Sequence, residues 1–285
     1  MRTPRRVTVE VTARCNLRCR YCYFFDNPAV PYRDLPVADW RRFFEECGRC
    51  AVMEVTIAGG EPFLRPDLPR IIEAIVANRM RFSVLSNGSH IDDAAAAFLA
   101  ATGRCDSVQI SVDGPSPESH DVCRGKGAFE GAIRGIRTLQ RHGVNVAARV
   151  TIHRHNVRHL EATAHLLLDD LGLKGIGTNA AGYLGSCRRN AGDVLLSVAD
   201  RQAAMETLVA LTVRYPGRVS ASAGPLAEAR RWAAMEGARA AGRPATAGGG
   251  CLSGCGCCWS SLAVRSDGAI VPCSMLSHVV LGQIG

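Results

Sequence analysis

The chain is organised around the stretch Arg14-Cys15-Asn16-Leu17-Arg18-Cys19-Arg20-Tyr21-Cys22-Tyr23. Its three cysteines follow a C-x3-C-x2-C spacing, just after a β-branched segment, residues 7–11, that predicts a strand. Iron–sulfur cubes of the [4Fe–4S] type are held by cysteine thiolates, usually four of them. Three neighbouring thiolates would therefore leave one iron without a protein ligand, and an open metal position is where a small molecule can bind and react. Zinc with a distant fourth ligand, or redox-active thiols, are the alternatives that this spacing alone leaves open.

Two further motifs follow predicted strands. Gly59-Gly60-Glu61-Pro62 comes directly after residues 53–58, and its glycines allow the backbone to approach a ligand closely. Ser111-Val112-Asp113-Gly114 ends the strand predicted over 107–112, and Arg124-Gly125 comes shortly afterwards. Hydroxyl and carboxylate side chains can hydrogen-bond to polar groups of a ligand, and a guanidinium suits a carboxylate. A turn residue and a surface charge are the plainer interpretations of the aspartate and the arginine.

Taken together, these motifs resemble those of the radical S-adenosylmethionine (SAM) superfamily, with Tyr21 in the aromatic slot of C-x3-C-x-aromatic-C. The resemblance implies that Cys15, Cys19 and Cys22 bind a [4Fe–4S] cluster whose open iron chelates SAM. An electron from that cluster would cleave SAM to methionine and a 5′-deoxyadenosyl radical. The SAM-binding residues implied are Tyr21, the main chain of Gly59, Gly60 and Glu61 near the methionine amino group, Ser111 and Asp113 near the ribose, and Arg124 near the methionine carboxylate.

The pattern of elements predicts an α/β fold. Strand and helix segments alternate six times before residue 217, which indicates a parallel sheet with right-handed crossovers. A closed barrel needs eight such units, so the family resemblance implies a partial (β/α)6 TIM-like barrel. Binding loops are expected at the C-terminal ends of the strands. We expect a barrel domain over 1–217 and a smaller region over 218–285.

The smaller region carries a second group of cysteines. Residues 262–264 and 269–271 flank an Asp-Gly turn, which predicts a β-hairpin that ends in Cys273. This part resembles the SPASM/twitch extension, which holds auxiliary [4Fe–4S] clusters. Structural zinc is the alternative, since several thiols also suit zinc. The expected ligands are Cys251, Cys258 and Cys273, with Cys255 or Cys257 as substitutes.

Three features depart from that extension or leave its chemistry open. The sequence stops at Gly285, short of the further cysteines of a full SPASM domain, which indicates either a truncated chain or a single auxiliary cluster completed by its own thiols. Ser274 stands where the sulfatase-maturating branch has an aspartate base, which argues against that activity. The loop predicted over 179–193 is expected to face the barrel mouth, where Cys187 is a candidate hydrogen-atom donor or else a packing cysteine.

Composition limits the partners. The chain has 285 residues with a formal net charge of +8, from 34 basic and 26 acidic residues. Its arginines are scattered, so no nucleic-acid-binding stripe stands out, and the balance favours an acidic partner such as a peptide, or simply a solvated surface. The sequence shows neither a signal peptide nor a membrane span. These features predict a cytoplasmic protein, in which cysteines, 13 here, are expected as metal ligands or catalytic thiols before disulfides.

The expected function is that of a radical SAM enzyme acting on a ribosomally made peptide, by thioether formation, carbon–carbon cross-linking, epimerisation or a related reaction. The alternatives are a cofactor-pathway enzyme acting on a small molecule or tetrapyrrole, and a non-catalytic iron–sulfur or zinc-binding protein. The sequence shows no winged-helix leader-binding domain before the first strand, so a peptide is expected to be recognised by the barrel mouth or by a separate leader-binding protein. Flavodoxin or ferredoxin is the expected reductant.

Overall fold

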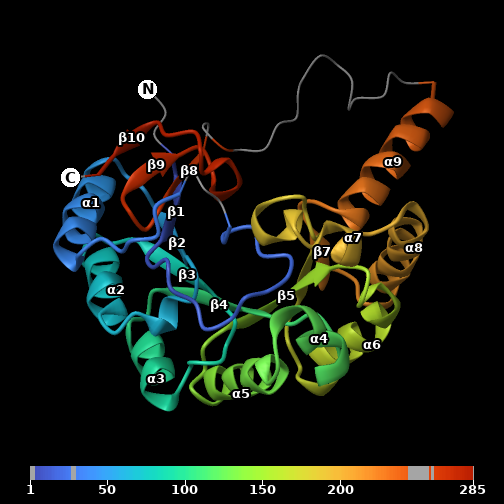
Figure 1. Ribbon diagram of the computed structural model, residues 1–285, viewed down its shortest axis with the longest axis horizontal. Coiled ribbons are helices and arrows are strands. Elements are labelled where there is room, and N and C mark those ends of the chain that lie inside the picture. The colour runs from blue at the N-terminus through green and yellow to red at the C-terminus, as the bar shows by residue number, and fades with distance from the viewer. Residues whose placement is uncertain (1–3, 27–29, 243–256, 258–259, 285) are drawn as a thin grey trace.

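The computed structural model describes residues 4–26, 30–242, 257 and 260–284. Their strands form one curved sheet in the order β10-β9-β8-β1-β2-β3-β4-β5-β6-β7 (Figure 1). Strands β1 to β7 run parallel to their neighbours, and so does β8 to β1. Their bounds are β1 Arg6–Glu10, β2 Glu54–Ala58, β3 Arg81–Ser86, β4 Cys105–Ser111, β5 Val146–Ile152, β6 Ile176–Ala180, β7 Val219–Ala221, β8 Ser261–Val264, β9 Ala269–Val271 and β10 Gly282–Gln283.

Helices cover the outer face of this sheet, and the segment that follows β1 runs along its inner side (Figure 1). A 3-10 turn, Pro62–Leu64, precedes α2, and the last turns of α6 continue as a π-helix, Leu166–Asp170. The α-helices are α1 Val37–Arg49, α2 Leu68–Ala77, α3 Asp93–Ala101, α4 Pro117–Arg124, α5 Ala128–Arg141, α6 Leu160–His165, α7 Ala191–Val194, α8 Val198–Arg214 and α9 Pro225–Ala240.

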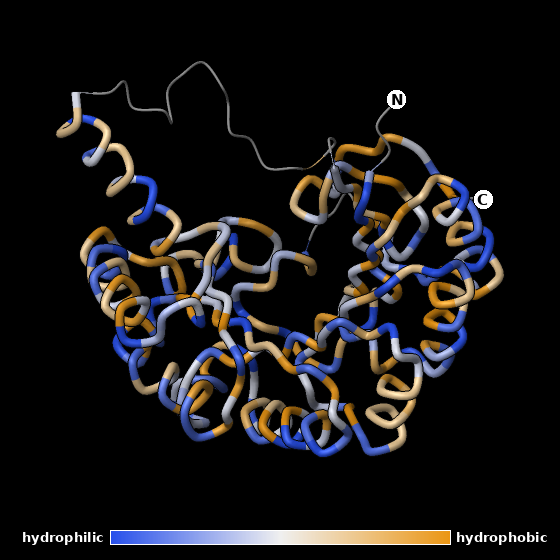
Figure 2. The backbone as a smooth tube through the Cα atoms, turned by 180° about the vertical axis from the view of Figure 1, so that it is seen from behind, coloured by the Kyte–Doolittle hydropathy of each residue, from blue (hydrophilic) through white to orange (hydrophobic). Residues whose placement is uncertain are grey.

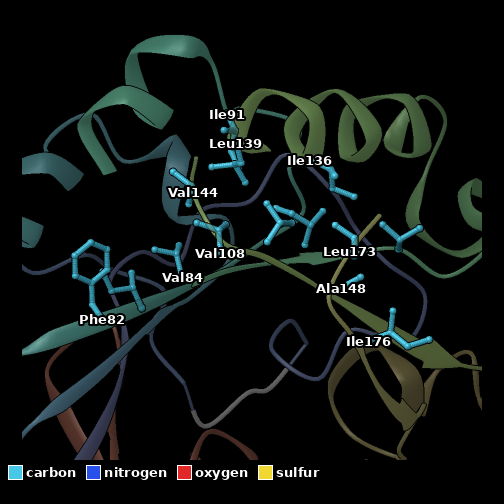
Figure 3. Packing of buried hydrophobic residues seen from close by; sticks show 14 of the residues in the cluster. Phe82, Val84, Ile91, Val108, Ile136, Leu139, Val144, Ala148, Leu173 and Ile176 are labelled. Atoms are coloured by element: carbon cyan, nitrogen blue, oxygen red, sulfur yellow. The ribbon is translucent and has the colours of Figure 1, made fainter. Parts of the chain in front are cut away.

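The hydrophobic core lies between the sheet and these helices. Outward-facing residues of the central strands, such as Val84 and Val108, meet Ile136 and Leu139 of α5 (Figure 3). Strand side chains alternate between faces and helix side chains recur every three to four residues. The two periodicities therefore bring apolar positions of the sequence into one layer, and Ile136 and Leu139 are fully buried.

This architecture confirms the predicted α/β partial barrel, and six strand–helix units follow in the expected order. Four strands, β7 at one edge and β8, β9 and β10 at the other, extend the sheet further. Strand β7 pairs with β6, and β8 adds to the other edge by pairing with β1, Arg6 opposite Ser261. The hairpin of β8 and β9 forms around a turn in which Gly268 adopts a φ of +89°.

Helix α9 projects away from the barrel. Its first residues, Pro225 and Leu226, are buried, whereas residues 230–237 are exposed all around. Both views show this helix extending away from the barrel (Figures 1 and 2), with Trp232 65% exposed.

Candidate functional site

The three cysteines lie on the cluster loop, which we define as residues 11–26, at the C-terminal end of β1. Each cysteine side chain is partly exposed. The Leu17 amide donates to the Cys15 Sγ over 3.4 Å, and the Cys22 amide donates to the Cys19 carbonyl over 3.0 Å. Burial raises the pKa of the Cys19 thiol to about 12. A thiolate at this position therefore requires a nearby cation, as metal coordination supplies.

The glycine pair after β2 packs directly on this loop. The Gly60 amide donates to the Thr12 carbonyl over 2.9 Å, and the Glu61 amide donates to the Arg14 carbonyl over 2.7 Å. A Cβ at position 60 would lie 2.2 Å from the Arg14 oxygen and 3.0 Å from the Cys15 Cβ. Gly59 also has a φ of +139°, which L side chains rarely adopt. Both glycines are thus required for close contact between the turn and the cluster loop.

The Glu61 side chain stabilises the same contact between the glycine turn and the cluster loop. Its buried carboxylate accepts from the Ser86 hydroxyl over 2.8 Å, from the Asn87 amide over 2.7 Å and from the Phe63 amide over 3.2 Å. Burial raises the pKa of Glu61 to about 7. The Asn87 side-chain amide in turn donates to Asn16 Oδ1 over 2.9 Å, so the residue after β3 contacts the cluster loop. Asn87 belongs to none of the motifs identified in the sequence; its place directly after the parallel strand β3 is the signal that could have found it.

Asp113 lies at the C-terminal end of β4 and is fully buried. Its carboxylate accepts two hydrogen bonds from Arg124, at 2.6 and 3.2 Å, one from the Thr151 amide at 2.9 Å, and one from the Tyr21 hydroxyl. Although burial opposes ionisation, the Arg124 guanidinium holds the pKa of Asp113 at about 2. These four bonds occupy the acceptor positions of a carboxylate. The expected contacts of Asp113 and Arg124 with SAM stay predictions, and the structure pairs the two side chains with each other.

Tyr21 joins this buried pair to the cluster loop. Its ring stacks on His153 at 5.4 Å, and the Arg124 guanidinium lies 5.4 Å from the ring centre. His153 follows β5 and is fully buried; its Nδ1 accepts from the His155 amide over 3.2 Å. Asp113, Arg124 and His153 therefore fix the loop segment between Cys19 and Cys22. His153 was missed from the sequence because a buried histidine carries no motif. Ser111 ends β4 and is partly exposed.

The segment expected as a loop over 179–193 forms a short 3-10 turn, Gly185–Arg188, and α7. The Ser186 amide donates to the Cys22 carbonyl over 2.8 Å, and Arg20 pairs with Asp193 at 2.6 Å. A Cβ on Gly185 would lie 2.4 Å from the same carbonyl of Cys22. This segment therefore braces the cluster loop.

Cys187 lies on the buried side of that bracing segment. Its side chain has no exposed surface and packs with Cys123 and Val194. A hydrogen-atom donor must reach the substrate radical, so a donor role for Cys187 would require movement of this segment and stays a prediction.

Of the second cysteine group, Cys257 and Cys273 are described, whereas Cys251, Cys255 and Cys258 lie outside the described residues. Cys273 follows β9 and is partly exposed, and Cys257 forms an isolated bridge with Ser261. Because β8 pairs with β1 and β9 runs back along β8, the hairpin that Cys273 follows lies beside the first strand of the sheet.

A cavity of about 710 Å³ opens beside the cluster loop. Arg18 caps the Phe25 ring at 4.2 Å, and Arg14 pairs with Asp34 at 3.4 Å. Its volume falls in the range of small-molecule and peptide-side-chain sites. The lining residues are Ala13, Arg14, Cys15, Arg18, Phe25, Tyr32 and Asp34.

The cluster loop fits a [4Fe–4S] cluster by its donor chemistry. Three thiols sit on one loop whose backbone is held by the Gly59–Gly60 turn and by the 185–193 segment. In the described part of the chain, no three cysteine, histidine or acidic side chains lie close enough to share one metal ion. A cube does not require this, because each thiolate binds a different iron.

The fold and the loop define a class: parallel α/β partial barrels with a three-cysteine loop at the strand C-termini. A comparison with known protein families identifies which family of this class is present: the model for the radical SAM superfamily matches residues 9–167. That match covers more than half of the chain, which belongs to this superfamily. Members of this superfamily use a [4Fe–4S] cluster and SAM, the two cofactors that the sequence predicted.

Relatives come from two groups. The chain is 28% identical over 221 residues to a PqqA peptide cyclase of Ruegeria pomeroyi, covering 76% of this chain and 58% of that one. It is 32% identical over 210 residues to a pre-heme d1 synthase of Dinoroseobacter shibae, covering 73% and 51%. The chain thus spans about half the length of the curated relatives that it matches.

Among solved structures, Streptococcus suis SuiB bound to its precursor peptide SuiA superposes with a TM-score of 0.77 at 14% identity, covering 99% of this chain and 62% of that one. This similarity supports the fold. Within the described residues, no helix combines the length and apolar character needed to cross a membrane.

Proposed function

We propose that this chain is a radical SAM enzyme that modifies a ribosomally made peptide in the cytoplasm. The observation that carries the proposal is the pairing of β8 with β1, which places a hairpin followed by Cys273 beside the strand that precedes the cluster loop. A cysteine-bearing hairpin at this place suits an enzyme that transfers electrons through a second cluster as well as through the SAM-binding cluster. The similarity to a PqqA peptide cyclase over 76% of the chain supports a peptide substrate.

In this proposal Cys15, Cys19 and Cys22 hold the first cluster, and Cys273 belongs to a second one with Cys251 and Cys258. The bound cluster and SAM supply a 5′-deoxyadenosyl radical, which removes a hydrogen atom from the substrate. The protein's own contribution is to hold the loop: the Gly59–Gly60 turn fixes Cys15. The Asp113–Arg124 pair fixes Tyr21 between the other two cysteines.

The cavity beside the cluster loop is the proposed entry for the peptide. Arg18 and Arg14 lie at its rim, and only the second is matched by an acidic lining residue, Asp34. An excess of positive charge favours a peptide segment that carries a carboxylate. Phe25 and Tyr32 offer apolar surface beside it. A separate leader-binding protein and a flavodoxin or ferredoxin reductant complete the proposal.

The test uses anaerobically reconstituted protein with dithionite and SAM. The parent chain should form 5′-deoxyadenosine, and a variant with alanine at Cys15, Cys19 and Cys22 should not. Co-expression with a candidate precursor peptide, followed by mass spectrometry, should then show a mass change that the triple variant lacks. Equal SAM cleavage by parent and variant would contradict the assignment of these ligands.

A second candidate function is the modification of a tetrapyrrole, which the 32% identity to a pre-heme d1 synthase favours. The substrate that stimulates the enzyme distinguishes the two candidate functions. If the chain modifies a tetrapyrrole, adding a tetrapyrrole should raise 5′-deoxyadenosine formation, whereas adding the precursor peptide should not. A non-catalytic carrier would form no 5′-deoxyadenosine at all.

A further inference from the structure

The inner face of the sheet carries polar side chains that remain partly exposed. On β4 and β5, apolar residues such as Val108 and Ala148 belong to the core beneath the helices and are buried (Figure 3). Side chains alternate between the two faces of a strand, so Gln109, Ser111 and Arg149 face the interior of the barrel, along which the cluster loop runs (Figure 1). Closed barrels fill their interior with packed side chains. These three residues are instead partly exposed, which shows that solvent enters the interior here.

Arg149 places a positive charge on this inner face. Its Nε donates to Gln109 Oε1 over 3.2 Å, whereas its other N–H groups have no hydrogen-bond partner within the described part of the chain. Asp113, at the end of the neighbouring strand, is already bonded to Arg124. Burial lowers the pKa of Arg149, and no carboxylate opposes that effect. A partly buried cation without a counter-charge is unfavourable, and groups of this kind are concentrated at functional sites.

Strand β6 leaves the guanidinium uncovered and adds an unpaired acceptor. Arg149 and Gly177 are partners in the parallel pairing of β5 with β6, and a Cβ on Gly177 would lie 3.3 Å from Arg149 Cζ. The guanidinium therefore lies across this glycine. Asn179, which pairs with Thr151, faces the same side two residues further along. Its Oδ1 is buried and has no hydrogen-bond partner among the described residues. A buried polar atom of this kind is costly unless a ligand supplies the partner.

The position of Arg149 along β5 brings it close to the cluster loop. Two residues further on, the Thr151 amide donates to Asp113 Oδ1 over 2.9 Å, and Asp113 accepts from the Tyr21 hydroxyl of the cluster loop. A strand rises about 3.3 Å per residue, so Arg149 lies about 7 Å along β5 from the level at which Tyr21 is held. A peptide residue whose side chain reaches Arg149 therefore has its backbone near the level of the cluster loop.

We propose that Arg149, supported by Gln109 and Asn179, binds an acidic side chain of the peptide substrate inside the barrel. The guanidinium donates to the carboxylate of a glutamate or aspartate in the fork geometry that carboxylates fit. Asn179 Oδ1 accepts a backbone N–H of the same peptide segment. Gln109 holds Nε, so the remaining N–H groups are free for the ligand. The inference rests on the proposed function and names the type of peptide residue that this site selects.

The test measures peptide binding to the anaerobically reconstituted holoenzyme with SAM, by calorimetry without reductant. The probes are acetyl-Gly-Glu-Gly-amide and acetyl-Gly-Gln-Gly-amide, which have the same shape and differ in the charge of the central side chain. The parent should bind the glutamate peptide about 10- to 100-fold more tightly, the effect expected of a charged hydrogen bond. Arg149→Gln should bind both peptides equally.

Three further variants separate the charge of Arg149 from its effect on folding. Asn179→Asp keeps the arginine but places a carboxylate beside it, so the glutamate preference should disappear even if Arg149→Gln is unstable. Arg149→Lys keeps the charge without the planar fork and should retain part of the preference. The matched control is Arg137→Gln, which removes an exposed arginine of α5, outside the sheet, and should keep the full preference. Iron content and SAM affinity are measured for each variant.

Every outcome decides the proposal. An equal preference in the parent and Arg149→Gln, or no binding of either peptide by the parent, overturns it, and the proposed function stands if the parent forms 5′-deoxyadenosine. Weaker SAM binding by Arg149→Gln with an unchanged glutamate preference would assign the guanidinium to the methionine carboxylate of SAM, which also overturns it. A parent chain that forms no 5′-deoxyadenosine would contradict the proposed function, and the ratio of the two peptide affinities would still decide the role of Arg149.

Discussion

Replacing Asp113 by asparagine removes the negative partner of a buried arginine. The two side chains are 0% and 7% exposed, and Arg124 Nε lies 2.6 Å from Asp113 Oδ2. Asparagine keeps the size of the side chain but leaves the Arg124 charge buried without a counter-charge. Because the Tyr21 hydroxyl and the Thr151 amide donate to the same carboxylate, their hydrogen bonds weaken as well.

The expected cost is about 3–5 kcal/mol, the range for breaking a buried ion pair by removing one partner. An exposed ion pair serves as the control for the destabilisation caused by breaking the buried pair. Arg141 and Asp93 lie 3.1 Å apart with side chains 58% and 68% exposed. Exposed pairs of this kind contribute little because water screens the two charges, so Asp93→Asn should change the free energy of unfolding far less than Asp113→Asn.

The assay is urea unfolding of both variants and the parent without metal, followed by iron content after anaerobic reconstitution. Asp113→Asn should lower the free energy of unfolding several times more than Asp93→Asn and should reduce iron, because Tyr21 holds the loop between Cys19 and Cys22. Adding Arg124→Gln should recover part of the stability, since the unpaired charge is then gone. If Asp113→Asn is no more destabilising than Asp93→Asn, the reasoning from burial and charge is wrong.

Three further outcomes follow from the same structure. Gly60→Ala should reduce iron content and destabilise the protein by about 1–3 kcal/mol as an overpacked site, because its Cβ would lie 2.2 Å from a backbone oxygen of the cluster loop; unchanged iron would contradict this packing. Glu10 has its pKa raised from 4.5 to about 7, so its stabilising effect is present below pH 4.5 and is lost as pH rises to 7. The parent should therefore lose about 3 kcal/mol across that window relative to Glu10→Gln in urea titrations at several pH values, and parallel curves would refute it. A variant with alanine at Cys15, Cys19 and Cys22 should retain about four irons per chain in the second cysteine group; iron and sulfide analysis that finds only zinc, or no metal, would speak against a second cluster.

Much of the fold could be predicted from the sequence, because the residues that build it act locally. Alternating Val7 and Val9 and the helical spacing of Trp40 and Phe44 each specify an element by periodicity. Helix α4 was not predicted, although Ser116 followed by a proline at the first helical position is a start signal. Strand β7 has only three residues and carries too little pattern to identify.

The site residues also fall into those that could be predicted from the sequence and those that could not. The cysteine spacing and the glycine pair are readable because their chemistry requires particular residues at fixed distances. Asp113 and Arg124 were identified as site residues, but their mutual pairing depends on side-chain directions that spacing does not give. Glu10 ends β1 and His153 follows β5. Both are buried single residues far apart in the sequence, and only the assembled sheet shows what surrounds them.

The pairing of β8 with β1 also has a consequence for biogenesis. Until Ser261 to Val264 leave the ribosome, the first strand has an open edge on that side, even though β2 already covers the other. Unpaired edges invite association with other chains, and contacts between sequence-distant segments form slowly. Glu10 would stay solvated and the cluster loop only half enclosed during that interval. Cluster insertion is therefore expected after synthesis rather than during it, and chains stalled upstream of β8 should be the ones that aggregate.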